Sequence, residues 1–132
     1  MDFIKVGSAC PKTKVADVIF NVENICSCID DAYNKDVKFL VFPELSITSY
    51  TCADLFLTST LINKSIEGIK LVCENSINKD MLIDVGCPLI HNNVLYNTAC
   101  IIFEGKILGI VPKSYIPNYS EFYEKRWFTA AA

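Results

Sequence analysis

The residues Val37–Phe42 form an almost continuously apolar run, VKFLVF, between Asp36 and Pro43. A run this short and this apolar is typical of a strand that is covered on both faces. Because strands that alternate with helices pack in layers, the run predicts an α/β fold. An apolar stripe at helical spacing precedes it, on Val18, Val22, Ile25, Ile29 and Ala32.

The other elements are predicted from similar patterns. We expect strands at residues 3–9, 81–85, 94–103 and 106–111, with turns at residues 91–93 and 104–105. The strand at 81–85 is expected to stop at Gly86–Cys87–Pro88, with residues 89–90 as a continuation. The first helix should begin at Asp17, and the second at Asp54, which would act as its N-cap. Residues 113–128 are polar and aromatic together, which predicts a loop.

Composition limits the class of protein. The chain has 132 residues, of which 52% are apolar and 20% charged, so it fits one folded domain. So much apolar sequence predicts that both faces of the strands are covered, or that further sequence completes the fold. No apolar run approaches the ~18–20 residues that span a bilayer. A net charge of −3 without a basic stripe argues against nucleic-acid and membrane-surface binding.

Cysteine usage indicates a reducing environment. Most of the seven cysteines lie in apolar runs, and the N-terminus lacks a signal-peptide pattern, so we expect buried thiols in a cytoplasmic protein. Cys26 and Cys28 have no second pair at zinc-site spacing, so no metal site is predicted. The seven are Cys10, Cys26, Cys28, Cys52, Cys73, Cys87 and Cys100.

Two charged residues follow predicted strands directly and could share a pocket. Glu44 follows the Val37–Phe42 run, where α/β proteins bind ligands, and its apolar neighbours should raise its pKa towards that of a general base. Lys113 follows the last strand and could stabilise an oxyanion. Glu121 could supply a second carboxylate. The alternatives are a turn or helix-capping role for Glu44, an exposed strand-end lysine, and a rim charge at Glu121.

Three longer stretches are far more specific than these two residues. They are PKTKVADVIFN from Pro11 to Asn21, FPELSITSYTCADLF from Phe42 to Phe56, and VPKSYIPNYSEFYEKRWF from Val111 to Phe128. Together they resemble the glutaminase domain of glutamine-dependent NAD synthetases, which belong to the nitrilase superfamily of carbon–nitrogen hydrolases. The resemblance covers Phe3 to Phe128.

The resemblance implies a role for each matching residue. Glu44 matches the general base, Lys113 the residue that holds the oxyanion, and Glu121 the second glutamate of the amidase branch. Tyr119 and Phe122 match positions that line the glutamine pocket. The implied reaction hydrolyses glutamine to glutamate and ammonia. The ammonia then passes to an ATP-dependent synthetase domain that amidates nicotinic acid adenine dinucleotide to NAD.

The resemblance also implies an architecture. Residues 1–128 would form the N-terminal portion of a nitrilase-like four-layer α-β-β-α sandwich. Residues 129–132 would be a terminal stretch whose three alanines, Ala130–Ala132, could be added or unassigned residues. The family's nucleophilic cysteine follows the lysine by a strand and a long loop, and no cysteine follows Cys100. We therefore expect no turnover by this chain alone. Partners would be glutamine, the synthetase domain with its ATP and Mg, and further copies in a homo-oligomer; the domain itself needs no cofactor.

Other interpretations remain open. Cys52 or Cys87 could replace the missing nucleophile, although both also fit buried thiols. His91 lies in a polar turn with no acid beside it, so a Cys–His pair has little support. The whole chain could instead be a different nitrilase-type amidase, or an inactive nitrilase-fold assembly module. The aromatic residues 115–128 could stack on bases, but the net charge favours a pocket wall or subunit contact.

Overall fold

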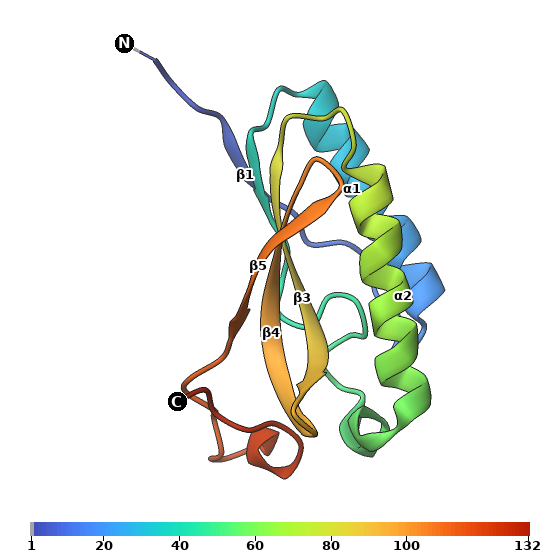
Figure 1. Cartoon of the computed structure of the whole chain (residues 1–132), viewed down its shortest axis with the longest axis vertical. Coiled ribbons are helices and arrows are strands. Elements are labelled where there is room, and N and C mark those ends of the chain that lie inside the picture. Colours follow the sequence, from blue (N-terminus) through green and yellow to red (C-terminus); the bar gives the residue numbers. More distant parts are fainter. Residues whose placement is uncertain (1) are drawn as a thin grey trace.

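A five-stranded mixed sheet carries two helices on one of its faces (Figure 1). The computed structural model describes residues 2–132. The elements in chain order are β1 (Val6–Ser8), α1 (Val18–Asn34), β2 (Phe39–Val41), the 3-10 helix η1 (Ala53–Leu57), α2 (Ser59–Asn75), β3 (Leu82–His91), β4 (Val94–Phe103), β5 (Lys106–Pro112) and the 3-10 helix η2 (Glu124–Arg126). The predicted α/β class is confirmed.

The strands lie in the sheet in their chain order. β1, β2 and β3 are parallel, and β4 and β5 continue the sheet as antiparallel hairpins. The predicted hairpin turns are confirmed, because Asn92 and Asn93 have φ of 50° and 62°, and Gly105 has φ of 79°. These left-handed conformations suit Asn and Gly.

β3 does not stop at Gly86–Cys87–Pro88, so that prediction is wrong. The three residues pair with Ala99, Thr98 and Asn97 of β4, and the strand runs without a break to His91. Glycine and proline favour a stop locally, but the nine residues of β3 that pair with β4 outweigh this local preference.

The start of α1 is confirmed and that of α2 is wrong. Asp17 caps α1 by accepting a hydrogen bond from the Phe20 N–H at 3.1 Å. Asp54 instead lies inside η1, and Thr58 caps α2 by accepting from the Leu61 N–H. The actual cap therefore lies four residues after the predicted one, directly after the end of η1.

The core lies between the helices and the sheet. Ile25 and Ile29 of α1 and Ile83 and Val85 of β3 are fully buried there. No helix among residues 2–132 covers the opposite face of the sheet (Figure 1), and β5 is exposed along most of its length. The molecule thus shows one helical layer and one sheet layer of the four that the resemblance implies.

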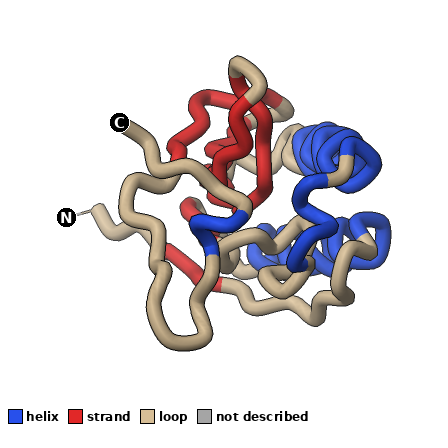
Figure 2. Tube along the Cα trace, turned by 90° about the horizontal axis from the view of Figure 1, so that it is seen from below, coloured by secondary structure: helices blue, strands red, loops and turns tan. Residues whose placement is uncertain are grey.

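The C-terminal segment is not only a loop, contrary to the prediction. It contains η2, and Phe128, which is 3% exposed, packs on Phe56 with a ring-centroid distance of 4.9 Å. In the view from below the segment crosses the end of the sheet (Figure 2). Beyond it, the Thr129 N–H donates to the Leu95 carbonyl at 3.0 Å, and the Ala131 N–H donates to the Lys113 carbonyl at 2.9 Å.

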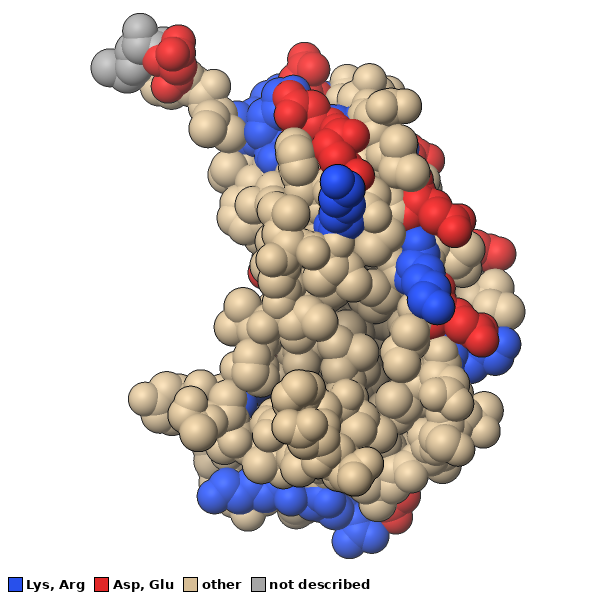
Figure 3. Space-filling model, viewed as in Figure 1, with Lys and Arg blue, Asp and Glu red and all other residues tan. Residues whose placement is uncertain are grey.

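Surface charge is mixed. On the face shown in Figure 3, acidic and basic side chains alternate along the helical edge, and positive ones gather at the lower end. No continuous positive stripe forms on that face. Among residues 2–132, none of the helices is long and apolar enough to cross a membrane.

Candidate active site

The ends of β2 and β5 bring Glu44 and Lys113 together. The two strands are not neighbours, since β3 and β4 lie between them, but they run in the same direction and end at one edge of the sheet. Lys113 Nζ donates to Glu44 Oε1 at 2.7 Å. The shared pocket predicted for these two residues is therefore present.

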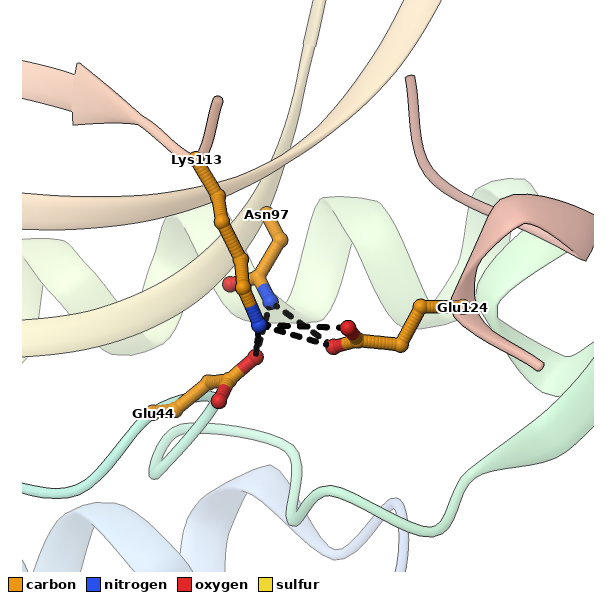
Figure 4. Close-up of polar contacts among 4 residues, drawn as sticks. All are labelled: Glu44, Asn97, Lys113 and Glu124. Atoms are coloured by element: carbon orange, nitrogen blue, oxygen red, sulfur yellow. Dashed lines mark hydrogen bonds and ion pairs between the residues drawn. The ribbon is translucent and has the colours of Figure 1, made fainter. Parts of the chain in front are cut away.

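A third charged group completes this cluster, and it is Glu124. Its side chain is 2% exposed, and its two carboxylate oxygens lie 3.2 and 3.1 Å from Lys113 Nζ. Asn97 of β4 donates from Nδ2 to Glu44 Oε1 at 2.5 Å and to Glu124 Oε1 at 3.5 Å. Figure 4 shows the two carboxyl groups converging on the ammonium, with the amide beside it.

The other predicted site residues lie outside this cluster. Glu121 is exposed, and none of the hydrogen bonds or ion pairs among residues 2–132 joins it to Glu44 or Lys113. Tyr119 is 67% exposed and packs edge-to-face on Phe122 at 5.6 Å. The structure thus brings Glu44 and Lys113 together but leaves Glu121, Tyr119 and Phe122 at the rim.

Sequence reasoning missed Glu124 and Asn97. Glu124 stands three residues after Glu121, one helical turn further along, and η2 turns it inward. Asn97 interrupts the apolar strand Val94–Phe103, where an amide needs a polar partner once it is buried. A single amide within an apolar strand was therefore the sequence signal that could have identified Asn97 as a site residue.

Backbone contacts hold the turn that carries Glu44. The Ile47 N–H donates to the Gly86 carbonyl at 3.1 Å, and Leu45 adopts a φ of 53°. Asn21, which is fully buried, donates to the Ile47 carbonyl at 3.0 Å. Asn21 belongs to one of the three specific stretches, so that stretch supports the turn that positions Glu44.

The pKa of Glu44 is lowered, which corrects the prediction that apolar neighbours would raise it. Burial does act to raise this pKa. Hydrogen bonds with Lys113, Glu124 and Asn97, together with the Lys113 charge, outweigh burial and favour the carboxylate. Burial likewise acts to lower the pKa of Lys113, but its contacts with Glu44 and Glu124 raise it.

The pKa of Glu124 shifts the other way. Burial raises it, and a hydrogen bond with the ionised Glu44 raises it further, against the opposing effect of Lys113. The two carboxyl groups therefore share one ammonium with unequal acidity: Glu44 is the stronger acid and Glu124 the weaker. The pKa of Tyr50 is raised, first by burial and then by the charges of Glu124 and Glu44, so Tyr50 lies within electrostatic range of both carboxyl groups.

Two cavities adjoin Glu44. One of about 340 Å³ also contacts Lys113, Asn97 and Asp84. The other, of about 180 Å³, is lined by Tyr50 and by hydroxyl and thiol side chains of Ser46, Ser49, Thr13 and Cys10. A small amide could approach a carboxylate and an ammonium here.

The candidate nucleophiles from the sequence lie away from these cavities. Cys52 is 2% exposed, donates from Sγ to the Thr48 carbonyl at 3.0 Å, and has a pKa raised by burial. Cys87 is fully buried, with Sγ 3.5 Å from Thr98 Oγ1. His91 is exposed and contacts Asn92. Among residues 2–132, no group of three metal-ligating side chains is present.

Comparison with known proteins gives a family. The carbon–nitrogen hydrolase model matches residues 5–131. The glutamine-dependent NAD(+) synthetase of Mycobacterium tuberculosis is 32% identical over 124 residues, which are 94% of this chain and 18% of that protein. The human enzyme of the same name is 35% identical over 109 residues, 83% of this chain and 15% of that protein. The chain thus spans less than a fifth of these relatives.

Solved structures agree. A glutamine-dependent NAD(+) synthetase from Cytophaga hutchinsonii superposes with a TM-score of 0.92 at 35% identity, over 96% of this chain and 22% of that one. A nitrilase-superfamily amidase from Nesterenkonia superposes with a TM-score of 0.78 at 15% identity, over 95% and 48%, which shows a shared fold. The predicted resemblance and the nitrilase-like fold are both confirmed. With Glu44 and Lys113 at one edge of that fold and the match over residues 5–131, the chain belongs to the carbon–nitrogen hydrolase family.

Proposed function

We propose that this chain supplies the Glu44–Lys113 part of a glutaminase site in a glutamine-dependent NAD synthetase. The observation that supports this most is the Lys113 ammonium, which bonds Glu44 at 2.7 Å and Glu124 at 3.1 Å beside a cavity of about 340 Å³. The relatives at 32–35% identity are glutamine-dependent NAD(+) synthetases. Among the amides that the family could hydrolyse, their name favours glutamine as the substrate.

Each group would have one role in the reaction. Glu44, ionised because its pKa is lowered, would take the proton of a cysteine thiol and later that of the hydrolytic water. Lys113 would stabilise the oxyanion of the tetrahedral intermediate. The thiolate attacks the amide carbon of glutamine, ammonia leaves with the proton from Glu44, and water then releases glutamate. As the resemblance implies, the nucleophilic cysteine would follow Lys113 by a strand and a long loop in a further part of the protein.

The second glutamate is better assigned to Glu124 than to Glu121. Glu124 contacts Lys113 directly and is buried, whereas Glu121 is exposed. Tyr119 and Phe122 would line the glutamine pocket from the rim, as the resemblance implies. The ammonia would serve an ATP- and Mg-dependent synthetase domain that amidates nicotinic acid adenine dinucleotide, and copies of the protein would associate as a homo-oligomer.

The test compares two nitrogen sources in the complete gene product. Glu44→Gln should abolish NAD formation from glutamine and spare formation from free ammonium, since only the first needs the hydrolysis. Lys113→Ala should cost about 10²-fold or more in glutamine hydrolysis, the typical effect of removing one oxyanion donor. Glu67→Gln, on the exposed face of α2, is the matched control and should change neither rate.

Three outcomes would refute the proposal. Loss of both activities in Glu44→Gln would place this residue outside the glutaminase reaction. Unchanged glutamine hydrolysis in that variant would do the same. Hydrolysis of another amide in preference to glutamine by the wild-type protein would identify a different amidase of the same family.

A further inference from the structure

Two of the three specific sequence stretches meet at Asp54. Its carboxylate accepts hydrogen bonds from Arg126 at both oxygens, Nε to Oδ1 at 2.7 Å and Nη2 to Oδ2 at 3.0 Å. Trp127 Nε1 donates to the same Oδ1 at 3.0 Å. Asp54 belongs to η1, and the two donors belong to the segment of η2, 72 and 73 residues further along the chain. The proposed reaction uses none of these three residues.

The donors belong to the same turn as Glu124. The Trp127 and Phe128 N–H groups donate to the Glu124 carbonyl at 3.0 and 2.8 Å, and the Glu124 N–H donates to the Pro117 carbonyl at 3.3 Å. A turn of three residues has no stability of its own as a helix, because nucleation costs more than one hydrogen bond returns. Contacts outside η2 must therefore fix the position of the Glu124 backbone.

The 3-10 helix η1 supplies those contacts from one side. Phe56, which is 1% exposed, packs on Trp127 and Phe128 with ring-centroid distances of 6.0 and 4.9 Å. Asp54 adds the directional contact, since a bidentate arginine–carboxylate pair fixes orientation as well as distance.

The Glu124 carboxyl group needs additional contacts to stay in the cluster. Its buried carboxyl group lies beside a second carboxylate, Glu44, and both burial and that neighbour disfavour its charged form. Only Lys113 and Asn97 offset this within the cluster. In solvent the charged carboxylate would not carry this burial cost, and the nearby Glu121 is exposed in this way.

We infer that Asp54 is a positioning residue: by binding Arg126 and Trp127 it fixes the η2 turn and keeps the Glu124 carboxyl group on Lys113. The inference goes beyond the proposed function, because it concerns the geometry of the cluster and holds whatever amide is hydrolysed. It also gives a structural reason why the sequence contains both the stretch around Asp54 and the stretch around Trp127.

The test uses the 132-residue chain and needs no turnover. Asp54→Asn keeps the side-chain size and removes the charge and one acceptor oxygen. Trp127 is the only tryptophan, so its fluorescence reports this contact directly. We expect its emission to shift to longer wavelength and its quenching by acrylamide to rise. In parallel, NMR titration of the Glu124 carboxyl carbon should show a fall of its midpoint towards that of an ordinary glutamate, as the side chain leaves the cluster.

Asp80→Asn is the matched control, because it removes a carboxylate from an exposed ion pair with Lys38 that does not touch η2. It should leave the Trp127 emission and the Glu124 titration unchanged. If Asp54→Asn shifts the Trp127 emission while the Glu124 midpoint stays at its wild-type value, Asp54 positions only the indole and the inference is wrong. If Asp54→Asn does not fold, Arg126→Gln breaks the same contact from η2 and the same two measurements decide. Glutamine hydrolysis does not enter either measurement, so a failure of the proposed function would leave the result intact.

Discussion

One ammonium serves two carboxyl groups at the edge of this sheet. If both glutamates were ionised, the cluster of Glu44, Glu124 and Lys113 would carry a net negative charge, and one of its carboxylates, Glu124, is buried. The opposite pKa shifts reduce that cost, because the pKa of Glu44 falls and that of Glu124 rises. Of the two carboxyl groups, Glu124 therefore binds a proton more readily, and Glu44 is the one that more readily carries the charge.

The shift at Glu124 predicts a pH-dependent effect on stability. A carboxyl group with a raised pKa in the folded state contributes stability below its unfolded value, near 4.5, and loses it as pH rises through the folded value. Glu124→Gln resembles the protonated form and loses nothing over that window. The free energy of unfolding of the variant relative to wild type should therefore increase from about pH 4.5 upward and then level off. Urea unfolding at a series of pH values measures this.

Glu121→Gln provides the control for that series. Its side chain is exposed, so its effect should stay within about 0.5 kcal/mol at every pH. A pH-independent difference between Glu124→Gln and wild type would show that the Glu124 pKa is the same in the folded and unfolded states. The opposite shift at Glu44 adds stability that is complete above its unfolded pKa, near 4.5, and is lost as pH falls through the lowered folded value, so it does not change over the window above pH 4.5.

Gly86 is the residue on which the Glu44 turn depends most closely. A Cβ at this position would meet the Leu45 backbone N, and would lie 2.8 Å from the Pro43 oxygen and 2.9 Å from the Glu44 carbonyl carbon. Because these are backbone atoms, the turn itself must move. We expect Gly86→Ala to cost about 1–3 kcal/mol or more and to shift the Glu44 and Lys113 NMR signals. Gly109→Ala, where a Cβ meets nothing within 4 Å, should change stability by no more than about 0.5 kcal/mol.

At the scale of single residues, the sequence predicted two of the four members of the active-site cluster, Glu44 and Lys113, and missed Glu124 and Asn97. Glu44 and Lys113 were found because each follows an apolar strand directly, and strand ends meet at sheet edges. Glu124 was missed because its placement depends on a turn held by Asp54, which lies 70 positions earlier and forms no local pattern with it. Long-range contacts of this kind leave no periodicity in the sequence.

Among the elements, α2 shows how a capping signal can mislead. Asp54 is followed by apolar residues as a helix start should be, and this predicted the cap. The structure uses that carboxylate for Arg126 instead, and Thr58 takes the capping position. Both residues are good caps by type, so tertiary contacts decided between them. The same holds for β3, whose glycine and proline mark a stop locally but pair within a ladder.

The assignment of Thr58 predicts the effect of its removal. Thr58→Ala deletes the acceptor for the Leu61 N–H and should lower the free energy of unfolding by about 1 kcal/mol. Thr60→Ala, two residues later on the exposed side of the first turn, keeps the cap and should be neutral or slightly stabilising, because alanine has the higher helix propensity. Equal losses in the two variants would contradict Thr58 as the cap.

For the whole molecule, the one-sided sheet accounts for the high apolar content. The helices cover one face, and the other face and the edge strand β5 expose large apolar residues such as Leu108 and Val111, at 61% and 59%. The apolar content predicted either strands covered on both faces or further sequence that completes the fold, and residues 2–132 cover the sheet on one face only. The family fold was predictable from the three specific stretches, whereas no helix among residues 2–132 covers the second face of the sheet.

The same layering predicts how the seven cysteines react. Cys10 is exposed, Cys26 and Cys28 are half-buried, and Cys52, Cys73, Cys87 and Cys100 are buried. Burial also raises the pKa of Cys26 to about 11, which suppresses its reactive thiolate. Native protein treated with a maleimide at neutral pH should therefore label Cys10 first and Cys26 and Cys28 slowly. The four buried thiols should react only at the rate of unfolding. Mass spectrometry of peptides at successive times gives the order, and early labelling of Cys87 or Cys100 would contradict a core packed between α2 and β3.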